Sequence, residues 1–267
     1  MAGLFQVLHG KPDGTFRGAE VLKGTDGEPL IIPTKGQEQM TENICTRPYA
    51  VDWDGDGHLD LVVGNFAGTF YWFKGQGQGK FPPRPEPVKA GDSPLRIEGA
   101  HSDPFVIDWD GDGDLDVLSG SSNGGVQWAE NRAGKGKAPE LGQFRPLIQP
   151  GASIGRGQAL SEADLTGPTH ATRVWVDDVN SDGKLDLLVG DSVTLITPAK
   201  GLGAEEFKKK LAEWEEAANA ASAAQQSADG PEKARAKARA EFSRVYARRN
   251  EFMHEEMTGF VWLYLQK

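Results

Sequence analysis

Hydrophobic and polar positions repeat in a fixed order along this chain. An aromatic segment leads into an acidic nine-residue stretch, then a short apolar segment closed by glycine, then a segment centred on tryptophan. The apolar segment recurs at 61–64, 117–120 and 187–190. Apolar runs of this length between glycine turns predict short β-strands. Four such strands form one blade of a β-propeller, so we expect an all-β propeller with about four blades visible.

The aromatic strands are expected at 48–51, 104–107 and 174–177, and tryptophan strands at 70–73 and 126–129. A fourth strand is expected at 80–81 in the first copy and at 143–144 in the second. Trp72, Trp128 and Trp262 recur in register and are predicted to lie in the core between blades.

The third copy is interrupted before its tryptophan strand. Residues 204–256 are alanine-rich and charged, with apolar residues at helical spacing on either side of a break at 229–231. We expect an inserted α-helical hairpin at 204–256, propeller blades at 1–200 and a final propeller strand at 257–267. The hairpin is either a packing appendage of the propeller or an arm that docks a partner.

The N-terminus carries part of the same repeat, because residues 7–16 match 72–81 in their glycine and phenylalanine positions. Without the hairpin the chain provides fewer than four blades, whereas a closed ring needs roughly four. We therefore expect the chain to be the C-terminal part of a larger ring, or to complete its ring in an unusual way.

The acidic stretches read D-x-[DN]-x-D-G-x-x-D and begin at Asp52, Asp108 and Asp178. Carboxylates this close repel one another unless a cation lies among them. Oxygen ligands at positions 1, 3, 5 and 9, with a backbone carbonyl at position 7, suit Ca²⁺. Glycine at position 6 allows the loop to fold back on itself. An EF-hand also needs a carboxylate at position 12. Since this chain has Val63, Ser119 and Val189 there, the loops are not expected to be EF-hands.

The three loops, their trailing glycines and the tryptophan strands resemble the FG-GAP/VCBS repeat family, which includes the propeller heads of integrin α subunits. The resemblance covers residues 3–200 and 257–267 and implies calcium in loops on one face of a propeller. The third site is expected to bind most weakly, since Asn180 replaces an aspartate and Lys184 lies within the loop. The implied ligands are Asp52, Asp54, Asp56, Asp60, Asp108, Asp110, Asp112, Asp116, Asp178, Asn180, Asp182 and Asp186, with the carbonyls of His58, Asp114 and Lys184.

Charge and composition limit the classes of partner and the cellular compartment that we expect for this protein. The net charge of −10 and the lack of a basic cluster argue against a nucleic-acid partner. No stretch of about 20 apolar residues could span a membrane. We expect an extracellular or periplasmic protein whose export signal has been removed from this chain, because millimolar calcium is found there. The single cysteine, Cys45, is expected to be a small buried residue.

No convergent nucleophile, base or zinc motif is visible, so we expect a non-catalytic module that binds a protein or a surface glycan. One alternative is a carbohydrate-active propeller, either a lectin or a polysaccharide lyase, with Arg96, His101, His170 and Arg173 as the residues of interest. A second is a structural subunit of a larger assembly that docks through the hairpin or through open blade edges. Trp53 and Trp109 either pack on the neighbouring blade or stack on sugars.

Overall fold

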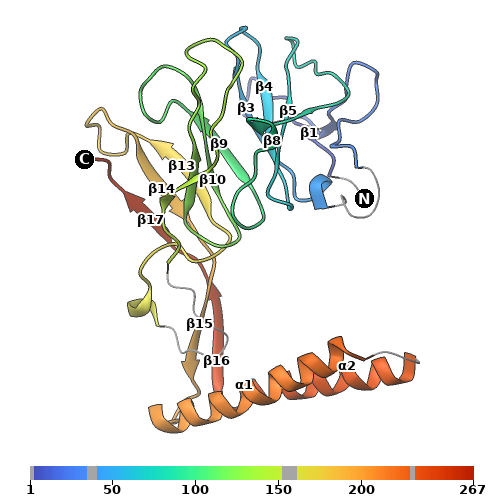
Figure 1. Ribbon diagram of the computed structural model, residues 1–267, viewed down its shortest axis with the longest axis vertical. Coiled ribbons are helices and arrows are strands. Elements are labelled where there is room, and N and C mark those ends of the chain that lie inside the picture. Colours follow the sequence, from blue (N-terminus) through green and yellow to red (C-terminus); the bar gives the residue numbers. More distant parts are fainter. Residues whose placement is uncertain (1–2, 35–40, 152–160, 229–231) are drawn as a thin grey trace. The chain divides into compact units, whose positions relative to one another are not determined.

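The computed structural model describes residues 3–34, 41–151, 161–228 and 232–267. It divides into two compact units, which are described separately (Figure 1). The core unit comprises Met1–Gly151, Gly167–Asp191 and Phe260–Lys267, and the inserted unit comprises Ala152–Thr166 and Ser192–Gly259. None of the described helices is long and apolar enough to cross a membrane.

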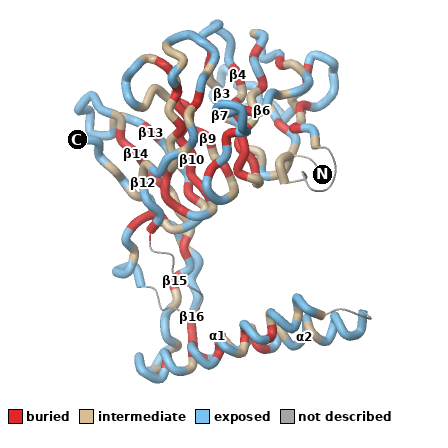
Figure 2. The backbone as a smooth tube through the Cα atoms, in the orientation of Figure 1, coloured by how far each residue is buried: buried red, intermediate tan, exposed pale blue. Residues whose placement is uncertain are grey.

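Two four-stranded antiparallel sheets form the centre of the core unit. The first sheet has the order β3 (Arg47–Val51), β4 (Asp60–Gly64), β5 (Phe70–Phe73) and β6 (Glu86–Pro87). The second sheet has the order β9 (Asp103–Ile107), β10 (Asp116–Gly120), β11 (Val126–Ala129) and β12 (Arg145–Ile148). The first three strands of each sheet confirm the repeat seen in the sequence. Buried residues concentrate along β4, β9 and β10 (Figure 2).

The fourth strands differ from their predicted positions. The first sheet ends with Glu86–Pro87 rather than with residues 80–81, and the second with Arg145–Ile148 rather than 143–144. Phe81 is buried in a cluster with Phe5 and Phe73 instead. A two-residue apolar signal does not distinguish an outer strand from a loop that inserts one ring into the core.

A third sheet has three strands, β13 (Arg173–Asp177), β14 (Asp186–Gly190) and β17 (Val261–Tyr264). Strands β14 and β17 pair across the insertion, with Leu187 opposite Tyr264. The described residues of the third copy thus supply three strands, and the final strand predicted within 257–267 is Val261–Tyr264. The described residues are mostly β, form several small antiparallel sheets and show no closed ring.

The prediction that Trp262 repeats Trp72 and Trp128 is wrong by one residue. Trp72 pairs with Val62 and Trp128 with Leu118, whereas the corresponding residue Leu188 pairs with Leu263. A shift of one residue moves a side chain to the opposite face of a sheet. Trp262 therefore packs toward the second sheet, in a cluster with Val176 and Leu187.

The N-terminal segment covers the free face of the first sheet. Strands β1 (Gln6–Val7) and β2 (Glu20–Val21) pair, and Phe5 packs edge-on against Phe73 with ring centroids 5.6 Å apart. The N–H of Lys11 donates to Thr15 O at 2.8 Å, as the N–H of Gln76 donates to Lys80 O at 2.9 Å. This shared turn confirms the partial repeat. Strands β7 (Lys89–Ala90) and β8 (Ser93–Pro94) form a small separate pair.

Cys45 is exposed, which corrects the expectation that it is buried. Its φ of +52° matches those of His101 (+62°) and Ala171 (+48°), which occupy the same place two residues before an inner strand. The chain turns sharply there, and the turn directs the side chain away from the core. Cysteine composition alone carries no information about such a turn.

The inserted unit consists of a strand pair and a helical hairpin. Strands β15 (Val193–Pro198) and β16 (Met253–Thr258) pair, and helices α1 (Ala204–Gln226) and α2 (Glu232–Ala247) pack together. The 3₁₀ turn η3 (Arg248–Glu251) follows α2, and a second, η2 (Glu162–Asp164), lies in the other segment of this unit. The predicted hairpin is present, although 253–256 are strand; the predicted break at 229–231 lies outside the described residues. The apolar residues at helical spacing that form its core are Phe207, Leu211, Trp214, Ala218, Phe242, Val245 and Phe252, whereas Ala238, which has the same spacing, is not among them.

Candidate metal centre

Each acidic loop joins an innermost strand to the second strand of the same sheet. The glycines at position 6, Gly57, Gly113 and Gly183, have φ of +86°, +96° and +87°, as the sequence predicts. Position 4 is also left-handed, with φ of +72° at Gly55, +79° at Gly111 and +60° at Ser181. The sequence reasoning missed this second requirement, although glycine at position 4 in two of the loops was its signal. Ser181 carries a Cβ in this conformation, which is unfavourable for the third loop.

Positions 1, 3 and 5 make the same backbone hydrogen bonds in all three loops. At position 1, Asp52, Asp108 and Asp178 accept from the position 6 glycine at 2.9, 3.0 and 2.9 Å. The position 3 side chain accepts from the position 5 N–H, and the position 5 side chain from the position 7 N–H. These bonds curl the loop so that its side-chain oxygens converge.

The aspartates at position 9 are fully buried and close the loop. Asp60 accepts from Trp53 N at 3.2 Å and from Gly75 N at 2.6 Å, and Asp116 accepts from Trp109 N and Asn131 N at 3.1 and 2.7 Å. Asp186 accepts from Val179 N and Gln266 N at 3.1 and 2.9 Å. Burial raises the pKa of Asp116 to about 6, although its two backbone hydrogen bonds oppose the shift. Each of these carboxylates thus links its loop to the chain two residues after the third strand of the same sheet.

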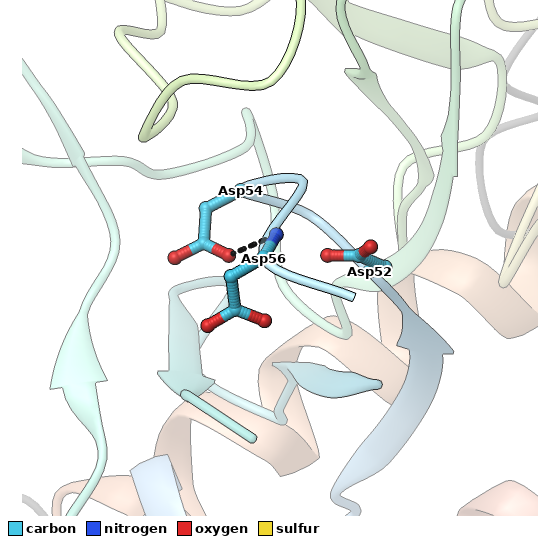
Figure 3. A group of neighbouring side chains, drawn as sticks. All are labelled: Asp52, Asp54 and Asp56. Carbon is cyan, nitrogen blue, oxygen red and sulfur yellow. Dashed lines mark hydrogen bonds between the residues drawn. The ribbon is translucent and has the colours of Figure 1, made fainter. Parts of the chain in front are cut away.

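Asp52, Asp54 and Asp56 form one carboxylate triplet, and Asp108, Asp110 and Asp112 form a second. In each triplet, one oxygen per residue lies within 4.8 Å of the others. Figure 3 shows the first triplet. The Oδ1 atom of Asp52 is buried and has no hydrogen-bond partner. A buried carboxylate oxygen without a partner is costly unless a cation or water satisfies it. The donor set of carboxylate oxygens therefore fits a hard divalent cation.

Lys74, the residue that follows β5, also contacts the first loop. Lys74 Nζ hydrogen-bonds Asp54 Oδ2 and lies 3.3 Å from Asp56 Oδ2. These contacts raise the pKa of Lys74, with the Asp54 hydrogen bond as the largest cause. The ammonium group thus supplies positive charge where a cation would supply it.

No lysine of the described residues makes such a contact with the second loop, which carries additional acid. Asp114 at position 7 is buried; its Oδ2 accepts from Gly134 N at 2.7 Å, and its Oδ1 has no hydrogen-bond partner. Burial raises the pKa of Asp110, and the charges of Asp112, Asp108 and Glu130 raise it further. The sequence assigned Asp114 a role through its carbonyl alone; the structure adds its side chain as a second candidate donor.

The third loop shares the fold of the other two but has fewer acids. Asn180 donates its amide to Asp182 Oδ2 at 3.1 Å, which occupies an oxygen that Asp182 would otherwise offer to a cation. Lys184 is exposed, as is His58 in the first loop, so at position 7 their carbonyls remain the candidate ligands.

The two tryptophans inside the loops pack on neighbouring sheets. Trp53 is buried and donates its Nε1–H to Leu115 O of the second sheet at 3.2 Å. Trp109 is partly buried against the cluster between the second and third sheets. Both contacts favour the packing interpretation over a sugar-stacking surface.

Three of the four residues of interest for a carbohydrate-active site, His101, His170 and Arg173, lie near enough to interact electrostatically, whereas Arg96 is bonded elsewhere. Burial lowers the pKa of His101, and the charges of Arg47, Arg173 and His170 lower it further. Arg173 Nε lies 3.2 Å from Asp103 Oδ2, which partly neutralises it. Arg96 donates instead to Ala67 O.

Comparison with known families gives one match. Residues 52–119, from the first acidic loop to Ser119 in β10, match the family model of the FG-GAP-like repeat. No curated protein and no solved structure matches the chain. The matched segment contains the first two loops, both carboxylate triplets and the strands between them. This part of the chain is thus an FG-GAP-like repeat segment, consistent with the FG-GAP/VCBS repeat family.

Proposed function

We propose that this chain is a calcium-stabilised, non-catalytic interaction module of the β-propeller type. The carboxylate triplet with the buried, unpartnered Oδ1 of Asp52 is the observation that carries the calcium assignment. The FG-GAP-like repeat at 52–119 supports an interaction module, because such repeats mediate protein contacts. A protein or a surface glycan is the proposed ligand class, and an extracellular or periplasmic location follows from the calcium requirement.

The side chains at positions 1, 3 and 5 of each loop would hold the ion, with the position 9 aspartate and the position 7 carbonyl completing the set. Bound calcium would supply positive charge and fix the loop's shape. The chain's own contribution is to gather the carboxylates by backbone hydrogen bonds and glycines of positive φ. Pinning the loop stabilises the two strands it joins, because an ion that binds the folded chain alone shifts the unfolding equilibrium.

Calorimetry with and without calcium tests this proposal. We expect calcium to raise the melting temperature of the core unit, and titration calorimetry to find binding that Asp112→Asn weakens more than Asp182→Asn does. Asp13→Asn is the matched control, since Asp13 is an exposed aspartate in a turn outside the three loops. If calcium leaves melting unchanged and metal analysis of the purified protein finds no divalent ion, the calcium assignment fails.

A further inference from the structure

The three sheets carry the same row of apolar residues across their first three strands. In the first sheet the row is Tyr49, Val62 and Trp72, and in the second it is Phe105, Leu118 and Trp128. The pairing register places Trp175, Leu188 and Leu263 at the same positions of the third sheet. The three rows are therefore directly comparable.

In the first two sheets the next sheet covers this row. Val106, Val117 and Ala129 of the second sheet pack in one cluster with the first row. Val176, Leu187 and Val189 of the third sheet pack in another cluster with the second row. As a result, Val62 and Leu118 are completely buried and Phe105 is 6% exposed.

Among the described residues of the core unit, no further sheet covers the row of the third sheet, although the ring of Trp175 meets Phe105 edge-on with centroids 5.4 Å apart. Trp175 is 59% exposed, Leu263 is 50% exposed and their neighbour Val261 is 71% exposed. Val179, which corresponds to the buried Trp53 at position 2 of its loop, is also exposed. We call Trp175, Val179, Leu188, Val261 and Leu263 the third-sheet face. A contiguous apolar surface of this kind marks an interaction site.

Two backbone groups of each of the first two sheets bind a hydroxyl group from the next sheet. The corresponding groups of the third sheet are not available in this way. Ser102 Oγ accepts from Asn65 N at 2.7 Å and donates to Thr69 O at 2.8 Å. Thr172 Oγ1 bridges Ser121 N and Gly125 O in the same way, at 2.9 and 2.8 Å.

In the third sheet the two corresponding groups bond to each other, since Asp191 N donates to Phe260 O at 3.0 Å. This bond takes up the two backbone groups whose counterparts bind the hydroxyls of Ser102 and Thr172 in the first two sheets. An occupant of the third-sheet face would therefore rely mainly on apolar contact and side-chain charge.

The charges beside the face are self-complementary. Arg173 and Asp177 lie at opposite ends of β13, two residues on either side of Trp175, so both alternate onto the same side of the strand. Asp177 is exposed, and Arg173, which uses Nε toward Asp103, is also largely exposed. A two-fold axis near Trp175 would bring Arg173 of one copy to Asp177 of the other. Such a symmetric contact is the commonest geometry of homodimers.

We propose that the third-sheet face binds the same face of a second copy of this chain, forming a two-fold dimer. The contact would cover the row of apolar residues that the next sheet covers in the first two sheets. It is independent of the proposed calcium function, because the calcium test measures melting and ion binding whereas this one measures mass.

Sedimentation equilibrium of the calcium-saturated full chain tests the dimer. We expect a mass near twice 28.8 kDa at micromolar concentrations. Trp175→Asp and Leu263→Lys should each weaken dimerisation at least tenfold, and Asp177→Arg should weaken it through like-charge contact with Arg173. Unchanged circular dichroism and melting would show that each variant still folds.

Phe16→Ser is the matched control, since Phe16 is an exposed apolar residue of the N-terminal segment. Loss of association in this control, or open-ended growth of wild-type oligomers, would indicate head-to-tail contact and overturn the proposal. A monomeric wild type at 100 µM would overturn it as well. Trp175→Cys in a Cys45→Ser background should form a disulfide between copies, because a residue near a two-fold axis meets its own counterpart; no cross-link would contradict the geometry.

Discussion

Gly120 lies directly beneath the backbone carbonyl of Thr172. A Cβ built on Gly120 would lie 2.2 Å from that oxygen, and Gly64 stands in the same relation to Ser102 O at 2.3 Å. The trailing glycine of the repeat thus lets the backbone of the next sheet approach closely. This glycine is needed for packing between sheets and not for a turn. Replacing it should therefore weaken the contact between neighbouring sheets.

Gly120→Ala should therefore destabilise the core unit, because the Cβ meets rigid backbone rather than a flexible side chain. Overpacking of this kind costs about 1–3 kcal/mol, or roughly 2–4 °C in melting temperature per kcal/mol for a domain of this size. Gly190→Ala is the matched control. Gly190 ends the same strand in the third copy, and its Cβ would meet nothing within 4 Å. Equal melting of the two variants would contradict this account of the glycine.

The hydroxyl of Thr172 gives a second prediction. Thr172 is fully buried, and Thr172→Val keeps its shape but leaves Ser121 N and Gly125 O without their partner. Unsatisfied buried groups cost about 1–3 kcal/mol each, so thermal melting should fall measurably. Thr15→Val is the control, since the Thr15 hydroxyl also hydrogen-bonds, to Asp13, but is exposed. Similar losses in both variants would mean that the hydroxyl does not act as a link between sheets.

The repeat, the loop positions and the inserted hairpin were predictable from the sequence because each rests on local spacing. Glycine at position 6, aspartate at position 9 and apolar residues at helical intervals are short-range signals. The structure agrees with them at Gly57, at Asp60 and along Phe207, Leu211 and Trp214.

Features that depend on a partner strand or a distant residue were not predictable. Trp262 looks like Trp128 in sequence, but the pairing of Leu188 with Leu263 places it on the other face. Lys74 lies 20 residues after Asp54 and reaches the first triplet only through the fold. Cys45 is exposed because it lies in a left-handed turn, and the residues around it do not predict that turn.

Lys74 should weaken calcium binding at the first loop. Its ammonium group contacts Asp54 and Asp56, so it must move before a cation can use both carboxylates. Lys74 is half exposed, which limits the effect, and Lys74→Gln should strengthen binding at this site by about three- to tenfold. Titration calorimetry measures the change, with Lys80→Gln, an exposed lysine in the following turn, as control. Weaker binding in Lys74→Gln would show that the lysine supports the site.

The hydrogen bonds of the position 9 aspartates give the length of the insertion in the third copy. Asp60 and Asp116 bind the N–H groups of Gly75 and Asn131, each 15 residues on, whereas Asp186 binds Gln266, 80 residues on. The third copy thus contains 65 additional residues. Asp191 N and Phe260 O, where the chain leaves and re-enters the core unit, are already hydrogen-bonded at 3.0 Å.

Replacing residues 192–259 with Ser-Asn-Gly, the three residues between Ser121 and Gly125, should therefore rebuild an ordinary turn. We expect the shortened chain to fold with a melting temperature within a few degrees of the core transition of the full chain, because a tight turn closes at little entropic cost. If the shortened chain still binds its partner, the surface that binds the partner lies on the sheets. A chain that folds but loses its partner would assign that surface to α1 and α2, and one that fails to fold would show that the inserted unit stabilises the core.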